Sequence, residues 1–213
     1  MIEKFLRAKH WHLFLLIIGP VVIGQISMFT LVFSRLEGSG GQPNPDEMMT
    51  IFGTFFSVVM LLSLVSYGVI FGWIYSLAVG TQRFIPDALK MNVQRFKIAF
   101  WIPIVYFVSM MIGMIFFFQR VFENPNAPVD EEFFSYFGII ALCHLIAIGC
   151  IIYAMRFAAK AFKTAELKRR ARFSDYIGEF FLLWFSFIGV WIIQPKVNEM
   201  VNAEEKDIIQ HLV

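Results

Sequence analysis

The chain has 213 residues, of which 58% are hydrophobic and 16% are charged. This balance excludes an ordinary water-soluble globular domain and places the chain in the membrane class. The formal net charge is +2, but the positions of the charges matter more than their sum. The only two cysteines, Cys143 and Cys150, both lie in an apolar run, which argues against a disulfide framework.

The first expected membrane span is Leu13–Ser34. A short basic start with Lys4, Arg7 and Lys9 precedes it. No small-x-small cleavage site follows this apolar run, so we expect a retained span rather than a cleaved signal peptide. Residues 35–47 are rich in Gly, Pro and Ser and form the expected first loop.

The second expected span lies within Met48–Gln82, which is 35 residues without a charged side chain. A bilayer core about 30 Å thick takes about 20 helical residues, so this run spans once with a turn or more to spare. Small residues recur in it at every fourth position, namely Gly68, Gly72, Ser76 and Gly80. On a helix they form one stripe, where another backbone can approach closely.

We expect this small-residue stripe to pack against another span of the same chain, with self-association as the alternative. Cys150, Ala154 and Ala158 form a comparable stripe on the fourth span and are the expected partner surface.

Two further spans follow. Residues 83–97 form a basic loop in which the sequence from Pro86 onward predicts a short amphipathic helix. Ile98–Gln119 is the third expected span, and Phe133–Met155 is the fourth, after a second Pro-rich loop at 120–132. No Gly or Pro lies between Ile151 and Tyr176, so the fourth helix is expected to continue beyond the membrane.

That continuation is a basic stalk at the membrane surface. It contains Arg156, Lys160, Lys163, Lys168, Arg169, Arg170 and Arg172. Its charges signal topology and would attract anionic lipid headgroups, each by about 1 kcal/mol. We expect no nucleic-acid partner, because the stretch has little of the aromatic interleaving that single-strand binding uses.

The charges also predict the orientation. Fourteen of the 18 Lys and Arg residues lie in the N-terminus, in 83–97 and in 156–172, whereas the other two loops hold one each. Basic loops stay in the cytoplasm, so the N-terminus is expected inside, with four spans following.

The last apolar run, Phe180–Ile193, has 14 residues. As a helix it would cover about 21 Å, which is short of a span. We expect a re-entrant or interfacial hairpin that turns near Gly189 and ends at Gln194-Pro195, followed by an amphipathic tail from Val197. A strained fifth span is the alternative.

No catalytic or cofactor motif is present in the sequence, and no span contains Asp or Glu. His144, near the middle of the fourth span, is the candidate intramembrane polar site. Its simpler interpretation is a neutral imidazole bonded to another helix. We therefore expect no enzyme activity, no cofactor and no metal.

The C-terminal fifth of the chain carries one resemblance. The stretches Ser174–Phe181 and Gly189–Asn198 resemble the C-terminal part of a group of small polytopic bacterial membrane proteins with no assigned function. The resemblance implies a bacterial inner-membrane location and implies nothing about activity.

The sequence thus predicts an all-α polytopic membrane protein with four transmembrane helices and a short fifth apolar segment. Residues 1–173 form the expected transmembrane bundle, and residues 174–213 the apolar segment and tail. The expected function is that of an accessory or scaffold subunit, or a self-assembling module, of a membrane complex. A small transporter or channel component that acts as an oligomer is the alternative.

Overall fold

The computed structural model describes residues 1–38, 45–123 and 131–212. In this part of the chain every regular element is helical. The elements in order are α1 (Ile2–Leu6), α2 (His10–Gly38), α3 (Pro45–Gly80), two short 3-10 turns η1 (Thr81–Phe84) and η2 (Asp87–Leu89), α4 (Val93–Glu123), α5 (Glu131–Leu167), α6 (Phe173–Trp184) and α7 (Ser186–Leu212).

Four of the described helices are long and apolar enough to cross a membrane. They are the segments His10–Arg35, Met49–Phe84, Val93–Phe117 and Gly138–Leu167. The predicted all-α polytopic fold with four candidate spans is therefore confirmed. Each follows from an uninterrupted apolar run, since a helix satisfies all of its own backbone hydrogen bonds in a medium that offers none.

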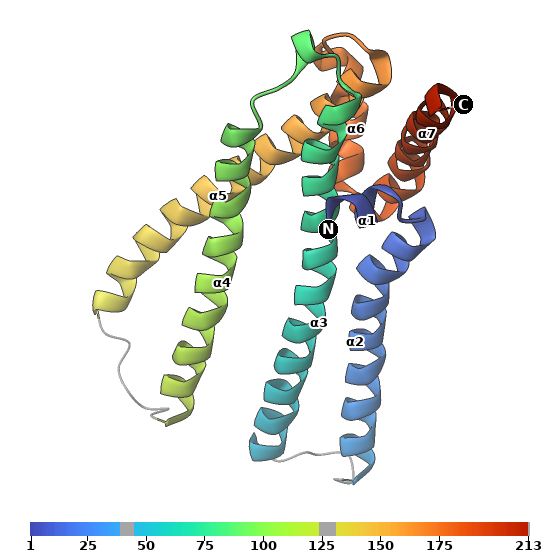
Figure 1. The fold of residues 1–213 in the computed structure, drawn as a ribbon. Coiled ribbons are helices and arrows are strands. Elements are labelled where there is room, and N and C mark those ends of the chain that lie inside the picture. The colour runs from blue at the N-terminus through green and yellow to red at the C-terminus, as the bar shows by residue number, and fades with distance from the viewer. Residues whose placement is uncertain (39–44, 124–130, 213) are drawn as a thin grey trace.

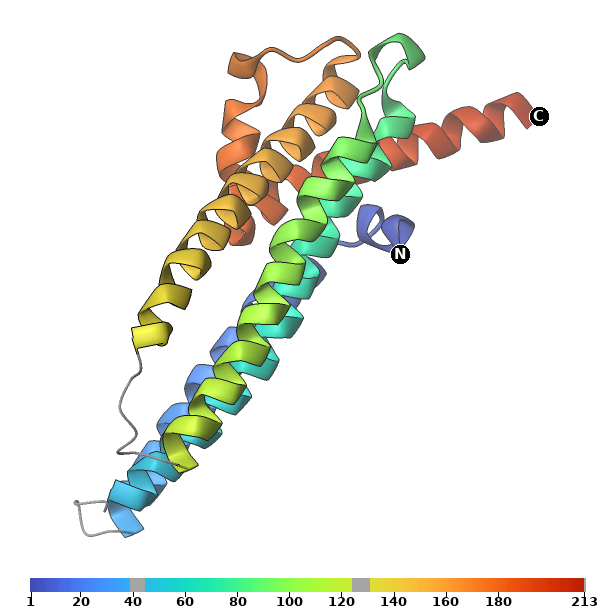
Figure 2. The same ribbon diagram turned by 90° about the vertical axis from the view of Figure 1, so that its left-hand side faces the viewer.

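The four spans form two antiparallel pairs, α2 with α3 and α4 with α5 (Figure 1). The remaining helices α1, α6 and α7 gather at one end of these pairs and form a cap. Both chain termini lie at this end, as do the basic turns between α3 and α4 and between α5 and α6 (Figures 1 and 2). The described basic segments therefore share one end of the molecule.

Side-chain burial is concentrated near the cap. Every described side chain of α5 from Gly138 to Ile146 is exposed, whereas Ala158, Ala161 and Ala165 have no accessible surface. In α4, no described residue after Pro103 is buried. Only 11% of the residues in the most apolar stretch of each span are buried, so the spans leave most of their surface to their surroundings.

The turn between α3 and α4 differs from its prediction. The amphipathic helix expected from Pro86 is only the 3-10 turn η2, and the backbone is extended at Lys90. Val93 and Phe96 belong instead to the first turn of α4. The reason is Asn92, whose side-chain oxygen accepts hydrogen bonds from the backbone N–H groups of Gln94 at 3.0 Å and Arg95 at 3.4 Å and so starts a new helix there.

Helix α5 continues out of its apolar stretch as predicted, but it ends at Leu167, before the stalk does. Lys168 ends it with a left-handed backbone, φ 52°, which an L-residue adopts at a cost. Its ammonium group donates to the carbonyl of Phe84 at 2.7 Å, and this bond holds the turn against η1. Asp175 then starts α6 by accepting from the backbone N–H of Arg172 at 2.8 Å.

The last apolar run folds as a helical hairpin rather than as one of the four candidate spans. The predicted position of its turn is wrong, because the chain turns at Phe185 and Gly189 lies inside α7. Gly189 is needed for close contact, since a Cβ there would meet the backbone oxygen of Leu182 on α6 at 2.0 Å. The expected break at Gln194-Pro195 is also wrong.

Helix α7 runs through Pro195 without interruption. Ile193, Val197 and Val201 lie on one face at four-residue spacing and have 0–1% exposure. Burying that face on both sides of Pro195 offsets the loss of a single helix hydrogen bond. These residues belong to one hydrophobic cluster that joins α1, the spans and the α6–α7 hairpin.

Candidate functional site

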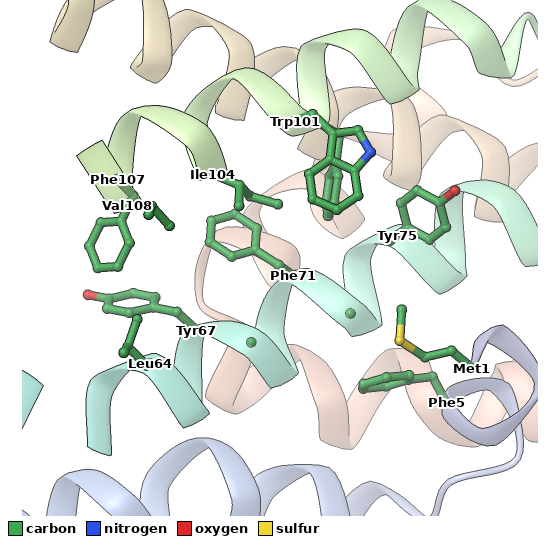
Figure 3. Close-up of a pocket in the computed structure, with 13 residues that line it drawn as sticks. Met1, Phe5, Leu64, Tyr67, Phe71, Tyr75, Trp101, Ile104, Phe107 and Val108 are labelled. Atoms are coloured by element: carbon green, nitrogen blue, oxygen red, sulfur yellow. The ribbon is translucent and has the colours of Figure 1, made fainter. Parts of the chain in front are cut away.

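A pocket of about 420 Å³ lies between α3 and α4, close to the cap (Figure 3). It is lined by Met1, Phe5, Leu64, Tyr67, Gly68, Phe71, Gly72, Tyr75, Phe100, Trp101, Ile104, Phe107 and Val108. None of these side chains is charged, and seven of them are aromatic. The pocket can therefore take an apolar or aromatic group.

The lining follows from helical spacing. On α3 the residues recur at intervals of three and four from Leu64 to Tyr75 and thus share one face. Aromatic rings from α3 and α4 contact each other edge to face. The ring centroids of Tyr67 and Phe107 are 5.6 Å apart, and those of Phe71 and Phe100 are 5.9 Å apart. Such pairs stabilise a fold by about 0.5–1.5 kcal/mol each, in addition to the effect of their buried area. The aromatic contacts therefore hold α3 and α4 together around the pocket.

Helix α1 covers the cap side of the pocket, and it occupies the small-residue stripe. A Cβ on Gly72 would meet the ring of Phe5 at 2.6 Å, and a Cβ on Gly80 would meet Leu6 at 2.7 Å. Ser76 is fully buried and donates to the carbonyl of Gly72 at 2.7 Å. Gly68 has no atom within 4 Å of its Cβ position and faces the pocket.

Gly72 and Gly80 therefore receive α1, not another span as expected from the sequence. Ala154 and Ala158 are buried, as expected for a packing surface. However, Ala154 lies beside Phe71 and Ile74 of α3, and neither of these residues belongs to the small-residue stripe. The four stripe residues are consequently not equivalent.

Gly72→Leu should displace Phe5 and weaken the docking of α1, at a cost of about 1–3 kcal/mol in the free energy of unfolding. Gly68→Leu should cost little, because its side chain enters open space. Thermal unfolding of the two variants in the same detergent measures the difference. Equal melting temperatures would contradict the placement of α1 on Gly72.

A single buried amide joins α1, α3 and α7. Gln194 has no accessible surface. Its side-chain oxygen accepts a hydrogen bond from the indole N–H of Trp73 at 2.8 Å. Its side-chain nitrogen donates to the carbonyls of Phe5 at 2.9 Å, Leu6 at 3.1 Å and Ala8 at 2.9 Å. Phe5 and Leu6 are the last residues of α1 and Ala8 follows it, so Gln194 caps the C-terminal end of α1 with a donor from another helix.

Neighbouring polar contacts hold α1 from the solvent side. Asn198 donates a second bond to the carbonyl of Leu6, at 3.0 Å. Glu3 pairs with Arg7 at 2.6 Å and with Arg83 at 2.8 Å. The hydrogen bond from Arg7 holds the pKa of Glu3 below its ordinary value, and Arg83 adds to this. These ion pairs are half-exposed, so each adds little to stability.

The acids of the C-terminal tail join the same network. Glu204 lies 3.2 Å from Arg83, and Glu205 pairs with Arg7. These pairs draw the tail toward α1 and η1 rather than toward the basic stalk. Helix α7 points away from the stalk (Figure 2), and Arg169 already pairs with Asp175 at 2.9 Å.

Most charges of the basic stalk have partners within the cap. Arg156 donates to the hydroxyl of Tyr176 at 3.0 Å, and Lys163 donates to Glu179 at 2.9 Å. Among the other stalk residues, Lys160 is half-buried, while Arg170 and Arg172 are exposed at the turn before α6. The stalk thus serves first to fix α6 on α5.

His144 is bonded to a neighbouring helix, as its simpler interpretation proposed. Its Nδ1 lies 3.2 Å from the hydroxyl of Tyr106 on α4. Cys143 and Cys150 are free thiols. Among the described residues, no group of three His, Cys, Asp or Glu could hold a metal ion.

The sequence analysis missed Gln194, and a signal was available. It is a lone amide directly after a 14-residue apolar run, where a polar side chain commonly bonds to another helix. Comparison with protein-family models, curated proteins and solved structures gives no match. The pocket, the cap and the exposed spans are therefore the features that bear on function.

Proposed function

We propose that this chain is a non-enzymatic accessory or scaffold subunit of a membrane assembly. The supporting observation is the contrast between a tightly bonded cap and spans that bury few of their own residues. A four-helix protein that functions without a partner would bury a continuous stripe of apolar side chains along each helix. Here α4 beyond Pro103 and α5 before Ala147 contain no buried residue among those described, so these helices expose apolar surface that a partner could cover.

The occupant that fits the α3–α4 pocket is a transmembrane helix of a partner chain that inserts an apolar side chain. The pocket is apolar and lies between two spans. Gly68, which has no side chain, leaves free space in its wall. Helices that meet in lipid associate by close packing at such sites rather than by the hydrophobic effect. The cap would hold α3 and α4 at the right separation.

We also propose a bacterial inner-membrane location with the cap in the cytoplasm. The support is the charge asymmetry together with the gathering of the basic segments at one end of the molecule (Figure 1).

The test is a mass measurement after mild extraction from native membranes, on the wild-type chain and two glycine variants. Gly68→Phe places a ring in the pocket at a position where an added Cβ meets no neighbouring atom, and Gly178→Phe adds the same ring to α6 in the cap at another open position. We expect a hetero-complex that Gly68→Phe reduces about 10-fold or more, as losing about 1.4 kcal/mol would, and that Gly178→Phe preserves. A ring-shaped homo-oligomer would support the channel alternative, and a lone chain would overturn both.

A further inference from the structure

A second apolar groove, of about 750 Å³, runs along the outer face of α4 and α5. Its apolar wall is formed by Ile98, Ile102 and Val105 on α4 and by Ile146 on α5. At the cap end it is bordered by two polar side chains, Lys97 and Gln94. It is thus apolar along its length and cationic at one end.

We propose that this groove binds one anionic phospholipid. The ammonium group of Lys97 and the side-chain amide of Gln94 contact the phosphate, and one acyl chain lies along the isoleucines. The lipid belongs to the leaflet at the cap end of the molecule.

The charge of Lys97 is available for such a ligand. Several other basic residues near the cap are already paired: Arg83 pairs with Glu3, Lys163 with Glu179, and Lys90 with Asp87 at 2.6 Å. No ion pair within the described ranges involves Lys97, and its side chain is half-buried. A half-buried ammonium group at the edge of hydrocarbon is stabilised by a phosphate in the headgroup layer.

The length of the groove fits one leaflet. Its α4 residues run from Gln94 to Tyr106, a rise of about 18 Å along a helix. Half of a hydrocarbon core about 30 Å thick is about 15 Å, which leaves room for the headgroup. Trp101, which also borders the groove, lies between the two ends, where an indole suits the boundary of the headgroups.

The far end of the groove is marked by a satisfied polar pair. Tyr106 lines it, and its hydroxyl bonds to Nδ1 of His144 at 3.2 Å. Because each group uses the other as its partner, neither needs a polar atom from the ligand at this depth. The ligand therefore has its polar group at Lys97 and hydrocarbon elsewhere, which is the chemistry of a lipid rather than of a free phosphate.

Lipid retention by the purified full-length chain tests the proposal. Micelles would contain equal amounts of phosphatidylglycerol and phosphatidylcholine with identical acyl chains, and native mass spectrometry would count the bound lipids. We expect one retained phosphatidylglycerol, with about 5-fold preference over phosphatidylcholine, which is the factor that one Lys near the surface supplies.

Lys97→Gln should remove this preference, whereas Arg95→Gln, an equal change of charge outside the groove lining, should keep it. Val105→Trp should fill the groove and reduce retention of both lipids. Circular dichroism confirms that each variant is folded, and Val105→Trp provides a test that leaves the charge unchanged.

Three results would overturn the proposal. Equal loss of preference in Lys97→Gln and Arg95→Gln would show diffuse attraction by surface charge. Displacement of the lipid by soluble glycerol phosphate would show a headgroup site without a chain in the groove. Undiminished retention in Val105→Trp would show that the lipid lies elsewhere. None of these results depends on a protein partner in the α3–α4 pocket.

Discussion

Gln194→Leu should unfold the cap at markedly lower temperature than the wild-type protein. The substitution leaves the buried indole N–H of Trp73 without an acceptor and leaves the carbonyls of Phe5, Leu6 and Ala8 without their shared donor. The carbonyls of Phe5 and Leu6 keep bonds from the backbone N–H of Ala8 and from Asn198, so the Trp73 N–H and the Ala8 carbonyl are the groups left unpaired. Each buried polar group left unpaired costs about 1–3 kcal/mol, so the two together should cost about 3 kcal/mol. For a chain of this size that corresponds to a melting temperature about 6–12 °C lower.

Thermal unfolding in detergent measures the change, and hydrogen exchange locates it, because the backbone N–H groups of α1 should lose protection first. Gln210→Leu is the control, since it makes the same change on the exposed outer part of α7. A melting temperature for Gln194→Leu that matches Gln210→Leu would show that α1 is held by its apolar contacts alone.

Gly189→Ala should separate α6 from α7 and destabilise the hairpin by about 3 kcal/mol, at the upper end of overpacking costs. The added Cβ would lie 2.0 Å from the backbone oxygen and 2.7 Å from the carbonyl carbon of Leu182. A side chain could rotate away, but a helix backbone cannot, so the two helices must move apart. The buried side chains of Leu183 and Val190 would then lose contacts as well.

Gly178→Ala is the matched control, because it places the same methyl group on the same hairpin where no atom lies within 4 Å. At a helical position with free space, alanine is favoured over glycine by about 1 kcal/mol. The two substitutions should therefore shift the melting temperature in opposite directions. A rise in both would contradict the close contact between Gly189 and Leu182.

The long spans were predictable because each depends on a local property. An apolar run of about 20 residues forms a membrane helix whatever its neighbours are, so the run from Ile98 to Gln119 was recognised, and the helix extends beyond it at both ends, from Val93 to Glu123. The excess of Lys and Arg in three segments likewise predicted that these segments share one end.

The cap was not predictable in the same way, because its residues act through partners far away in the chain. Gly189 is a turn former by type, yet its role is to let Leu182 come close. Pro195 ends helices by type, yet the buried faces of Ile193 and Val197 keep α7 intact. The stripe at Gly72 indicated a close approach, but nothing in the periodicity shows that the approaching element is the five-residue helix α1.

The bond between Gln194 and the carbonyls of α1 also has a consequence for biogenesis. Helix α1 leaves the ribosome before the four spans and Gln194 emerges after them, so while the spans are being made the carbonyls at the end of α1 are without this donor. The stripe at Gly72 can meet α1 earlier, as soon as α3 is inserted, but the bond that fastens it must wait for α7. A helix made after the spans thus completes the attachment of a helix made before them, and a chain truncated before Gln194 should carry a loosely held α1 that membrane quality-control proteases can attack.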